Sequence, residues 1–256
     1  MMTLRRKWLF AVLALPIAFM FLLPGAVWGG LWVGVEAGPT YHSNVDVVEG
    51  AYWAQEKTYE NVKFDVNFLG GLTVGYDFNN EGFGGRTWPS WMKYFSLALD
   101  VTYEDVSFGH QWVTVAVQGN NNVPFRKVQG ITRSCSVSMF TITPMIIGKY
   151  GFFSSEEIPF GRLQPYLGFG PGLVISNPKV NGLIDEERNK VDLSLMAEGG
   201  LRFMLLRNVS LDAALRYRTI PTKFGNSFHS PGDDAKVNID WYPDLFTAML
   251  RLSYHF

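Results

Sequence analysis

Residues 191–219 read VDLSLMAEGGLRFMLLRNVSLDAALRYRT, and this stretch decides the fold class. Apolar side chains recur at alternate positions on both sides of residues 206–208, with polar, charged or small residues between them. Successive side chains of a β-strand point to opposite faces of its sheet, so this period of two is typical of strands. The stretch therefore predicts two long strands, Val191–Leu205 and Val209–Thr219, joined by a tight turn at Leu206–Asn208.

The same alternation recurs along the chain after residue 30, and no segment there shows the 3.6-residue period of a long amphipathic helix. The fold class is therefore predicted to be all-β. Six further strands are expected, at Trp32–Tyr41, Lys63–Phe78, Met92–Val106, Ser134–Tyr150, Gln164–Ser176 and Leu245–Phe256.

A membrane barrel explains these strands better than a soluble sandwich. They are longer than the average of about five or six residues in soluble proteins. In all of them except Gln164–Ser176 one face carries charged residues, which a sandwich core would reject. The connections 42–62, 107–133, 177–190 and 220–244 are long and polar, whereas Leu206–Asn208 is short. Long loops at one end and short turns at the other are typical of outer-membrane barrels.

Hydrocarbon offers no hydrogen-bond partners, so a membrane-spanning sheet must close on itself. We therefore expect an antiparallel up-and-down transmembrane β-barrel, most simply of eight strands, although 107–133 and 220–244 leave room for strand extensions. Aromatic residues near the strand ends are expected to form two interfacial girdles. They are Trp32, Tyr41, Tyr76, Phe78, Tyr103, Tyr150, Tyr217, Phe246, Tyr254 and Phe256.

The N-terminus has the parts of a secretory signal peptide. Arg5, Arg6 and Lys7 precede an apolar run over 8–27, and small residues follow. We expect cleavage near Gly30, which leaves residues 1–29 as signal peptide and 30–256 as the barrel domain. A retained signal anchor is the alternative, because the run is long enough to span a bilayer.

Composition excludes several other classes. The net charge of −1 and the pI of about 6.4 argue against nucleic-acid binding. A disulfide framework is excluded because Cys135 is the only cysteine. Several membrane-spanning helices are excluded because the mean hydropathy is only +0.04.

Three segments resemble the small eight-stranded outer-membrane barrels of the OmpA/OmpX/OmpW-like superfamily. Residues 164–172 (QPYLGFGPG) resemble one of their Gly-rich strands, 210–218 (SLDAALRYR) their seventh strand, and 251–256 (RLSYHF) their closing strand. The resemblance implies that the barrel-assembly machinery reads the last strand as an assembly signal. The residues implied are Phe246, Leu250, Leu252, Tyr254 and Phe256.

The predicted inner faces collect acids and bases in near balance, and a barrel of eight strands leaves space only for side chains. We therefore expect an ion-pair network that fills the lumen. Its members are Glu36, Asp65, Asp100, Glu104, Glu198, Arg202, Asp212, Arg216, Arg218 and Arg251. A gated, narrow polar path through a rearranging network is the functional alternative.

Other chemistry is weakly supported. His229 and Ser230 are adjacent, but a Pro/Gly loop does not fix a nucleophile–base geometry, so a lipid A-modifying hydrolase is only an alternative. We expect no metal site, no cofactor and no enzymatic activity.

The sequence thus predicts a non-enzymatic, monomeric protein of the cell outer membrane, in contact with outer-membrane lipids and lipopolysaccharide. A structural or surface-interaction role, or slow porin-like passage of small solutes, fits this description. A loop-mediated adhesin or receptor remains a further alternative.

Overall fold

The computed structural model describes most of the chain after residue 29. The described ranges are 30–51, 56–78, 88–117, 125–132, 134–180, 184–185, 190–221, 224–229, 236–241 and 244–256. The predicted signal peptide, residues 1–29, lies outside them. In these ranges there is no helix with the length and apolar character needed to cross a membrane.

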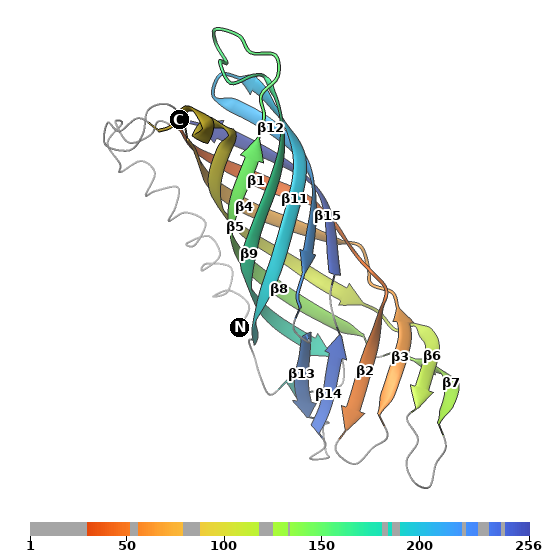
Figure 1. The fold of residues 1–256 in the computed structure, drawn as a ribbon. Coiled ribbons are helices and arrows are strands. Elements are labelled where there is room, and N and C mark those ends of the chain that lie inside the picture. The colour runs from red at the N-terminus through yellow and green to blue at the C-terminus, as the bar shows by residue number, and fades with distance from the viewer. Residues whose placement is uncertain are drawn as a thin grey trace, which may run out of the picture.

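Eight antiparallel strands close into a barrel, in the order β1-β15-β12-β11-β9-β8-β5-β4 (Figure 1). They are β1 (Leu31–His42), β4 (Asn67–Asp77), β5 (Phe95–Phe108), β8 (Cys135–Lys149), β9 (Leu163–Val180), β11 (Lys190–Leu206), β12 (Val209–Thr219) and β15 (Asp244–His255). Each barrel strand pairs with the next barrel strand along the chain, and β15 pairs with β1 to close the wall. The predicted all-β, up-and-down barrel of eight strands is confirmed.

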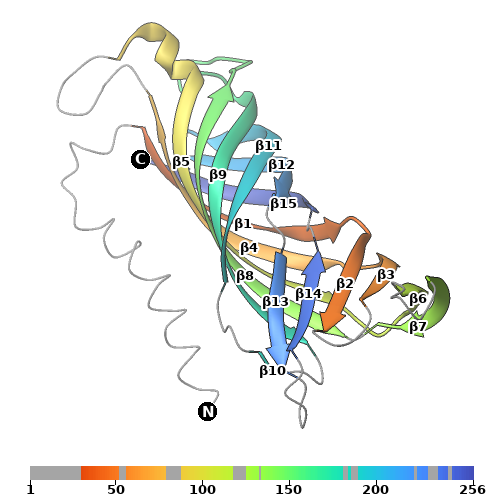
Figure 2. The same cartoon turned by 60° about the horizontal axis from the view of Figure 1, so that its bottom comes forward.

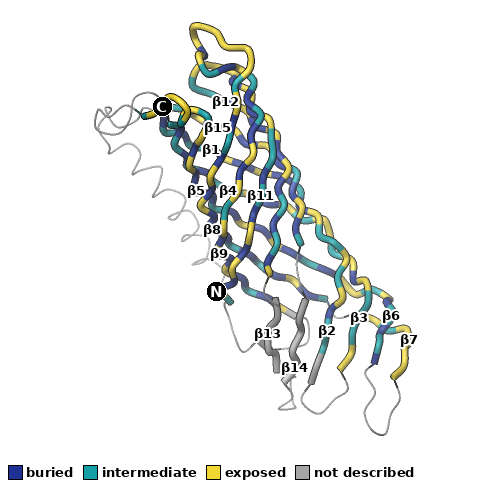
Figure 3. Tube along the Cα trace, in the orientation of Figure 1, coloured by how far each residue is buried: buried dark blue, intermediate teal, exposed yellow. Residues whose placement is uncertain are grey.

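The period of two in the sequence becomes an inside–outside alternation in the barrel wall. Along β12 every even-numbered residue from Ser210 to Arg218 is buried, and the odd-numbered residues face outward. Figure 3 shows the same alternation of buried and exposed positions along the other barrel strands. Successive residues of a strand point to opposite faces. The register of a strand therefore decides, for all of its residues at once, which side chains face the lumen and which face outward.

The two ends of the barrel differ. At the turn end, Arg207 and Asn208 form the tight turn between β11 and β12, and the Phe256 N–H donates to the Leu31 carbonyl. At the loop end, the connections that follow β1, β5, β9 and β12 extend beyond the barrel (Figure 2).

These long connections are not simply polar loops, and this corrects the sequence-based prediction. They form a seven-stranded sheet, here called the loop sheet, in the order β10-β13-β14-β2-β3-β6-β7. Its strands are β2 (Val45–Ala51), β3 (Lys57–Val62), β6 (Trp112–Val117), β7 (Arg126–Ile131), β10 (Ile184–Asp185), β13 (Phe224–His229) and β14 (Lys236–Trp241). Strands from four connections make one sheet because each supplies hydrogen-bonding edges for the next.

Three strand boundaries also differ from prediction by three residues or more, and one of them is the end of β9, at Val180 where Ser176 was predicted. Residues 63–66 are not part of β4, which begins at Asn67, because the chain passes there from the loop sheet to the barrel wall. Met92–Tyr94 belong to a 3₁₀-helix, Ser90–Tyr94, and not to β5. On β8, the side chains of Met139, Met145 and Ile147 are buried, so apolar residues share the inner face with polar ones.

Gly38 allows the β1–β15 seam to close. A Cβ at this position would lie 1.9 Å from the Ala248 carbonyl oxygen and 2.7 Å from the Met249 Cα, so backbone would have to move. We expect Gly38→Val to destabilise the barrel by about 3 kcal/mol or more, measured as loss of the folded, faster-migrating band on unheated gels. Gly70→Val is the matched control, because a Cβ there meets no atom within 4 Å. Equal folding of both variants would contradict this prediction.

Candidate functional site

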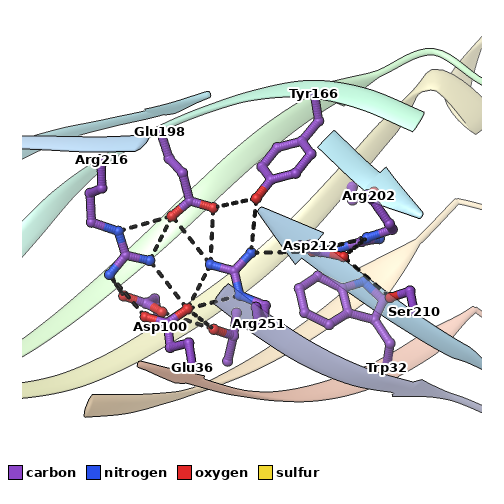
Figure 4. A network of polar contacts seen from close by, with 12 residues as sticks. Trp32, Glu36, Asp100, Tyr166, Glu198, Arg202, Ser210, Asp212, Arg216 and Arg251 are labelled. Carbon is purple, nitrogen blue, oxygen red and sulfur yellow. Dashed lines mark hydrogen bonds and ion pairs between the residues drawn. The ribbon is translucent and has the colours of Figure 1, made fainter. Parts of the chain in front are cut away.

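Two arginines at the centre of the barrel share the carboxylates of Glu36 and Glu198 (Figure 4). Arg216 Nη1 lies 2.9 Å from Glu36 Oε1 and 3.0 Å from Asp100 Oδ2, and its Nη2 lies 2.6 Å from Glu198 Oε2. Arg251 Nη2 lies 2.7 Å from Glu36 Oε2 and 2.9 Å from Glu198 Oε1. No side chain of the five is more than 1% exposed. The five residues come from five different strands, so this central cluster ties the wall together across the lumen.

Hydroxyl groups complete the central cluster. The Tyr166 hydroxyl donates to Glu198 Oε1 at 2.9 Å. The Thr73 hydroxyl lies 3.0 Å from Glu36 Oε2 and 2.9 Å from Asp100 Oδ1. Buried carboxylates need such partners because they have lost those of water. Sequence reasoning had not assigned Tyr166 or Thr73 to the network, although both lie at inner positions of the alternation.

A second ion pair lies beside the cluster, toward the turn end. Arg202 Nε lies 3.1 Å from both carboxylate oxygens of Asp212. The Arg202 guanidinium also stacks over the Trp32 ring, 4.6 Å from its centroid. Trp32 is fully buried, so its predicted place in an interfacial girdle is wrong. Its ring occupies lumen space because Arg202 and Asp77 offer it a cation and a hydrogen-bond acceptor.

A third pair closes the turn end of the lumen. Lys149 Nζ lies 2.7 Å from Asp77 Oδ1, and the Trp32 indole donates to the same oxygen. Lys149 also lies over the Phe160 ring, 5.1 Å from its centroid. Phe160 belongs to the connection between β8 and β9, so this connection packs against the barrel mouth.

At the loop end, the lumen changes from charged to apolar. Arg218 Nη1 lies 2.6 Å from Glu104 Oε1, and its Nη2 donates to the Thr102 hydroxyl. Beyond this pair lies a buried apolar cluster that the sequence alternation did not predict. Its members are Val47, Val62, Val106, Phe108, Cys135, Val137, Met139, Val174, Ile220 and Leu245. Val47 and Val62 come from the loop sheet, so this cluster joins the sheet to the barrel.

The structure brings together all of the predicted network residues except Asp65. Asp65 is exposed in the segment between β3 and β4, where its Oδ2 accepts a hydrogen bond from Ser107. Its assignment to the lumen is corrected, because this segment is not part of the barrel wall.

The outer face of the barrel is the opposite of its interior. Large apolar side chains stand exposed or half-exposed at the outward positions of the barrel strands, among them Val35, Leu97, Ile146 and Leu250. A soluble protein buries such residues and exposes its charges. A closed wall that leaves no unpaired strand edge, with an apolar exterior and a charged interior, suits hydrocarbon. The chain is an outer-membrane β-barrel protein. The turn end therefore faces the periplasm, and the loop end faces the outside of the cell.

Comparisons with known proteins give only distant likenesses. No family model and no curated protein matches the chain. Among solved structures, OprG of Pseudomonas aeruginosa has a TM-score of 0.47 and 16% identity, covering 90% of this chain and 98% of that chain. Neisserial surface protein A has a TM-score of 0.42 and 14% identity, covering 89% and 98%. Ail of Yersinia pestis has a TM-score of 0.35 and 13% identity, covering 86% and 99%.

Aromatic residues gather at both edges of the apolar belt. At the periplasmic end, Tyr254 contacts Phe256 with ring centroids 5.0 Å apart. At the other edge, Tyr217 contacts Phe246 at 4.9 Å. The side chains of the predicted assembly signal, Phe246, Leu250, Leu252, Tyr254 and Phe256, all face outward and are 45–57% exposed. Their reading by the assembly machinery stays a prediction.

One constellation resembles a catalytic triad. Ser210 Oγ lies 3.0 Å from His255 Nε2, and His255 Nδ1 lies 3.9 Å from Asp77 Oδ2. The Ser210 side chain is fully buried, so no substrate can approach its hydroxyl. The distance from His255 to Asp77 is also too long for a hydrogen bond. We assign these contacts to packing of the closing strand.

The pair that the sequence singled out for hydrolysis is only partly described. His229 ends β13, where it pairs with Lys236 of β14 and with Ile184 of β10. Ser230 lies outside the described residues. Within the described ranges, no group of three or more His, Cys, Asp and Glu side chains could hold a metal ion.

Proposed function

We propose that this protein is a non-enzymatic surface-interaction protein of the outer membrane. In this proposal the barrel is a rigid, filled anchor among outer-membrane lipids and lipopolysaccharide, and the loop sheet is the binding element. The observation that carries the proposal is the loop sheet itself. Four connections converge into one sheet outside the membrane. A protein that acted only as an anchor would not need this sheet, because separate loops would be sufficient.

The filled interior supports an anchor over an open pore. Arg216 and Arg251 each bridge carboxylates on opposite sides of the lumen, and the apolar cluster lies above them. A water-filled channel would leave charged side chains hydrated, whereas these are buried.

Deleting the β6–β7 hairpin tests the proposal. We expect cells that display the full protein to gain attachment, to one another or to a coated surface, relative to cells without it. Replacing residues 113–130 by a short turn should abolish the gain, because it removes two of the seven strands. The unheated gel shift should persist, because the barrel wall is intact. Undiminished attachment by the folded deletion variant would overturn the proposal.

Slow passage of small solutes is a second candidate. A cavity of about 660 Å³ opens at the periplasmic mouth and reaches Asp77, Lys149 and His255. A rearranged network could extend this cavity through the lumen. Conductance in planar bilayers tests this: Arg202→Ala and Arg251→Ala should raise conductance if their ion pairs close the path. A barrel that stays silent in both folded variants argues against passage.

A further inference from the structure

The loop sheet ends in an open edge. Among the residues that the structure describes, β7 has a hydrogen-bonded neighbour on one side only, β6. Most of β7 is exposed, and Figure 3 shows it as exposed along nearly its whole length. An edge strand presents a row of unpaired N–H and C=O groups, which is a template for pairing with another strand.

The side chains along this edge are apolar as well as charged. Phe125, Val128 and Ile131 are 63%, 41% and 49% exposed. Lys127 is neutralised by Glu60 of β3, with Nζ 2.6 Å from Oε1. The edge thus combines free backbone groups with apolar surface. Proline is absent from β7, and Lys127, a residue type that protects many edges, is paired with Glu60.

The sequence of β7 complements itself. In a two-fold antiparallel pair of identical strands, opposite residues lie on the same face, so the pair is centred on one residue. Centred on Val128, the pairing puts Val128 opposite Val128 and Phe125 opposite Ile131. Lys127 then faces Gln129, and Arg126 faces Gly130, which leaves room for the longer side chain. No cation directly faces a cation.

Neighbouring registers are poorer. A pair centred on Lys127 puts two ammonium groups directly opposite each other, which is destabilising. A pair centred on Gln129 puts Lys127 opposite the exposed Ile131. The apolar and charged positions of β7 therefore select the register centred on Val128.

Strand direction decides where the second copy lies. β6 leads away from the barrel and β7 returns to it, since Ile131 pairs with Trp112 beside the barrel and Arg126 pairs with Val117 at the far end. The Thr132 N–H donates to the Gln111 carbonyl, which fixes this near end. An antiparallel pair aligns the near end of one β7 with the far end of the other. The two barrels then lie at opposite ends of the joined sheet.

We propose that β7 pairs with β7 of a second copy of this chain that stands in a facing membrane. Each barrel remains a monomer in its own membrane, and the joined sheet bridges the two. This inference rests on the proposed function, and it names the partner of the loop sheet.

A charge-exchange experiment tests the pairing. The protein is refolded into phosphatidylcholine vesicles, and clustering is followed by dynamic light scattering. Wild-type vesicles should cluster. Vesicles with Val128→Lys alone or Val128→Glu alone should lose clustering, because like charges meet at the two-fold axis. A mixture of the two should regain it, because each lysine then meets a glutamate. Folding of each variant is checked by its unheated gel shift.

Thr58→Lys is the matched control, since it adds the same charge to β3, away from the edge. Its vesicles should cluster like the wild type. Dispersed wild-type vesicles, clustering by Val128→Lys vesicles, or a dispersed mixture of folded variants would each overturn the pairing. If the pairing fails while the hairpin deletion still abolishes cell attachment, the proposed function stands with a different partner. If the deletion has no effect either, both fail.

Discussion

Replacing Arg251 by methionine should destabilise the barrel by about 3–5 kcal/mol, the cost of leaving buried charges without their partner. Arg251 approaches three carboxylates: Glu36 at 2.7 Å, Glu198 at 2.9 Å and Asp212 at 3.6 Å. Methionine fills part of the space but offers none of them a counter-charge. The measurement is denaturant unfolding in detergent micelles, followed by tryptophan fluorescence.

Two further variants serve as comparisons for the stability of the Arg251→Met variant. Arg218 has one carboxylate partner in its ion pair, Glu104, so Arg218→Met should cost less than Arg251→Met. Arg207 is exposed in the periplasmic turn, and Arg207→Met should change stability by no more than about 0.5 kcal/mol. Equal effects of all three variants would show that the central cluster does not stabilise the barrel.

Leu250→Arg should cost about 2–4 kcal/mol, as for a cation on the lipid face at the midplane of the bilayer. Leu250 is 57% exposed and lies halfway along β15 between Phe246 and Tyr254, which mark the two edges of the apolar belt. In water, an exposed leucine could be replaced by arginine at little cost. The measurement is unfolding of protein refolded into lipid vesicles without cellular assembly factors.

The control for Leu250 is an exposed apolar residue of the loop sheet, outside the membrane. Trp112 of β6 is 72% exposed in the loop sheet, so Trp112→Arg should change stability by about 0.5 kcal/mol or less. A Leu250→Arg variant as stable as Trp112→Arg would mean that the exterior of the barrel does not face hydrocarbon.

Both predictions concern the same feature: charged side chains are buried in the barrel, and apolar side chains are exposed on its outer face. Lipid makes the exterior apolar, and inside the barrel the ion pairs share the lumen with a second buried cluster. Its members are Trp32, Ala98, Met145, Ile147, Tyr166, Met196, Ala214 and Met249. A separate apolar cluster lies at the loop end, where residues of the loop sheet pack against the barrel strands. Buried ion pairs and apolar packing therefore both stabilise the interior of the protein.

The sequence by itself determined the barrel and most of the charged residues of its interior. Alternation along Val209–Thr219 set which side chains face inward, because a strand has no other period, and the lack of hydrogen-bond partners in hydrocarbon required the sheet to close. The alternation places Asp77, Tyr166 and Trp32 on the inner face, but it does not identify them as network members. Alternation shows which face a side chain takes and does not show which residue it contacts. Partners such as Arg216 and Glu36, 180 residues apart, depend on the register of strands around the closed wall.

Only the tertiary structure decided the loop sheet. Its strands are short, and their neighbours come from other connections, so no local period marks them against ordinary polar loops. The exclusion of Asp65 from the lumen has the same cause, since alternation continues through the residues where the chain leaves one sheet for the other. Local sequence fixes the direction of a side chain, whereas pairing between distant segments depends on which edges the closed barrel brings side by side.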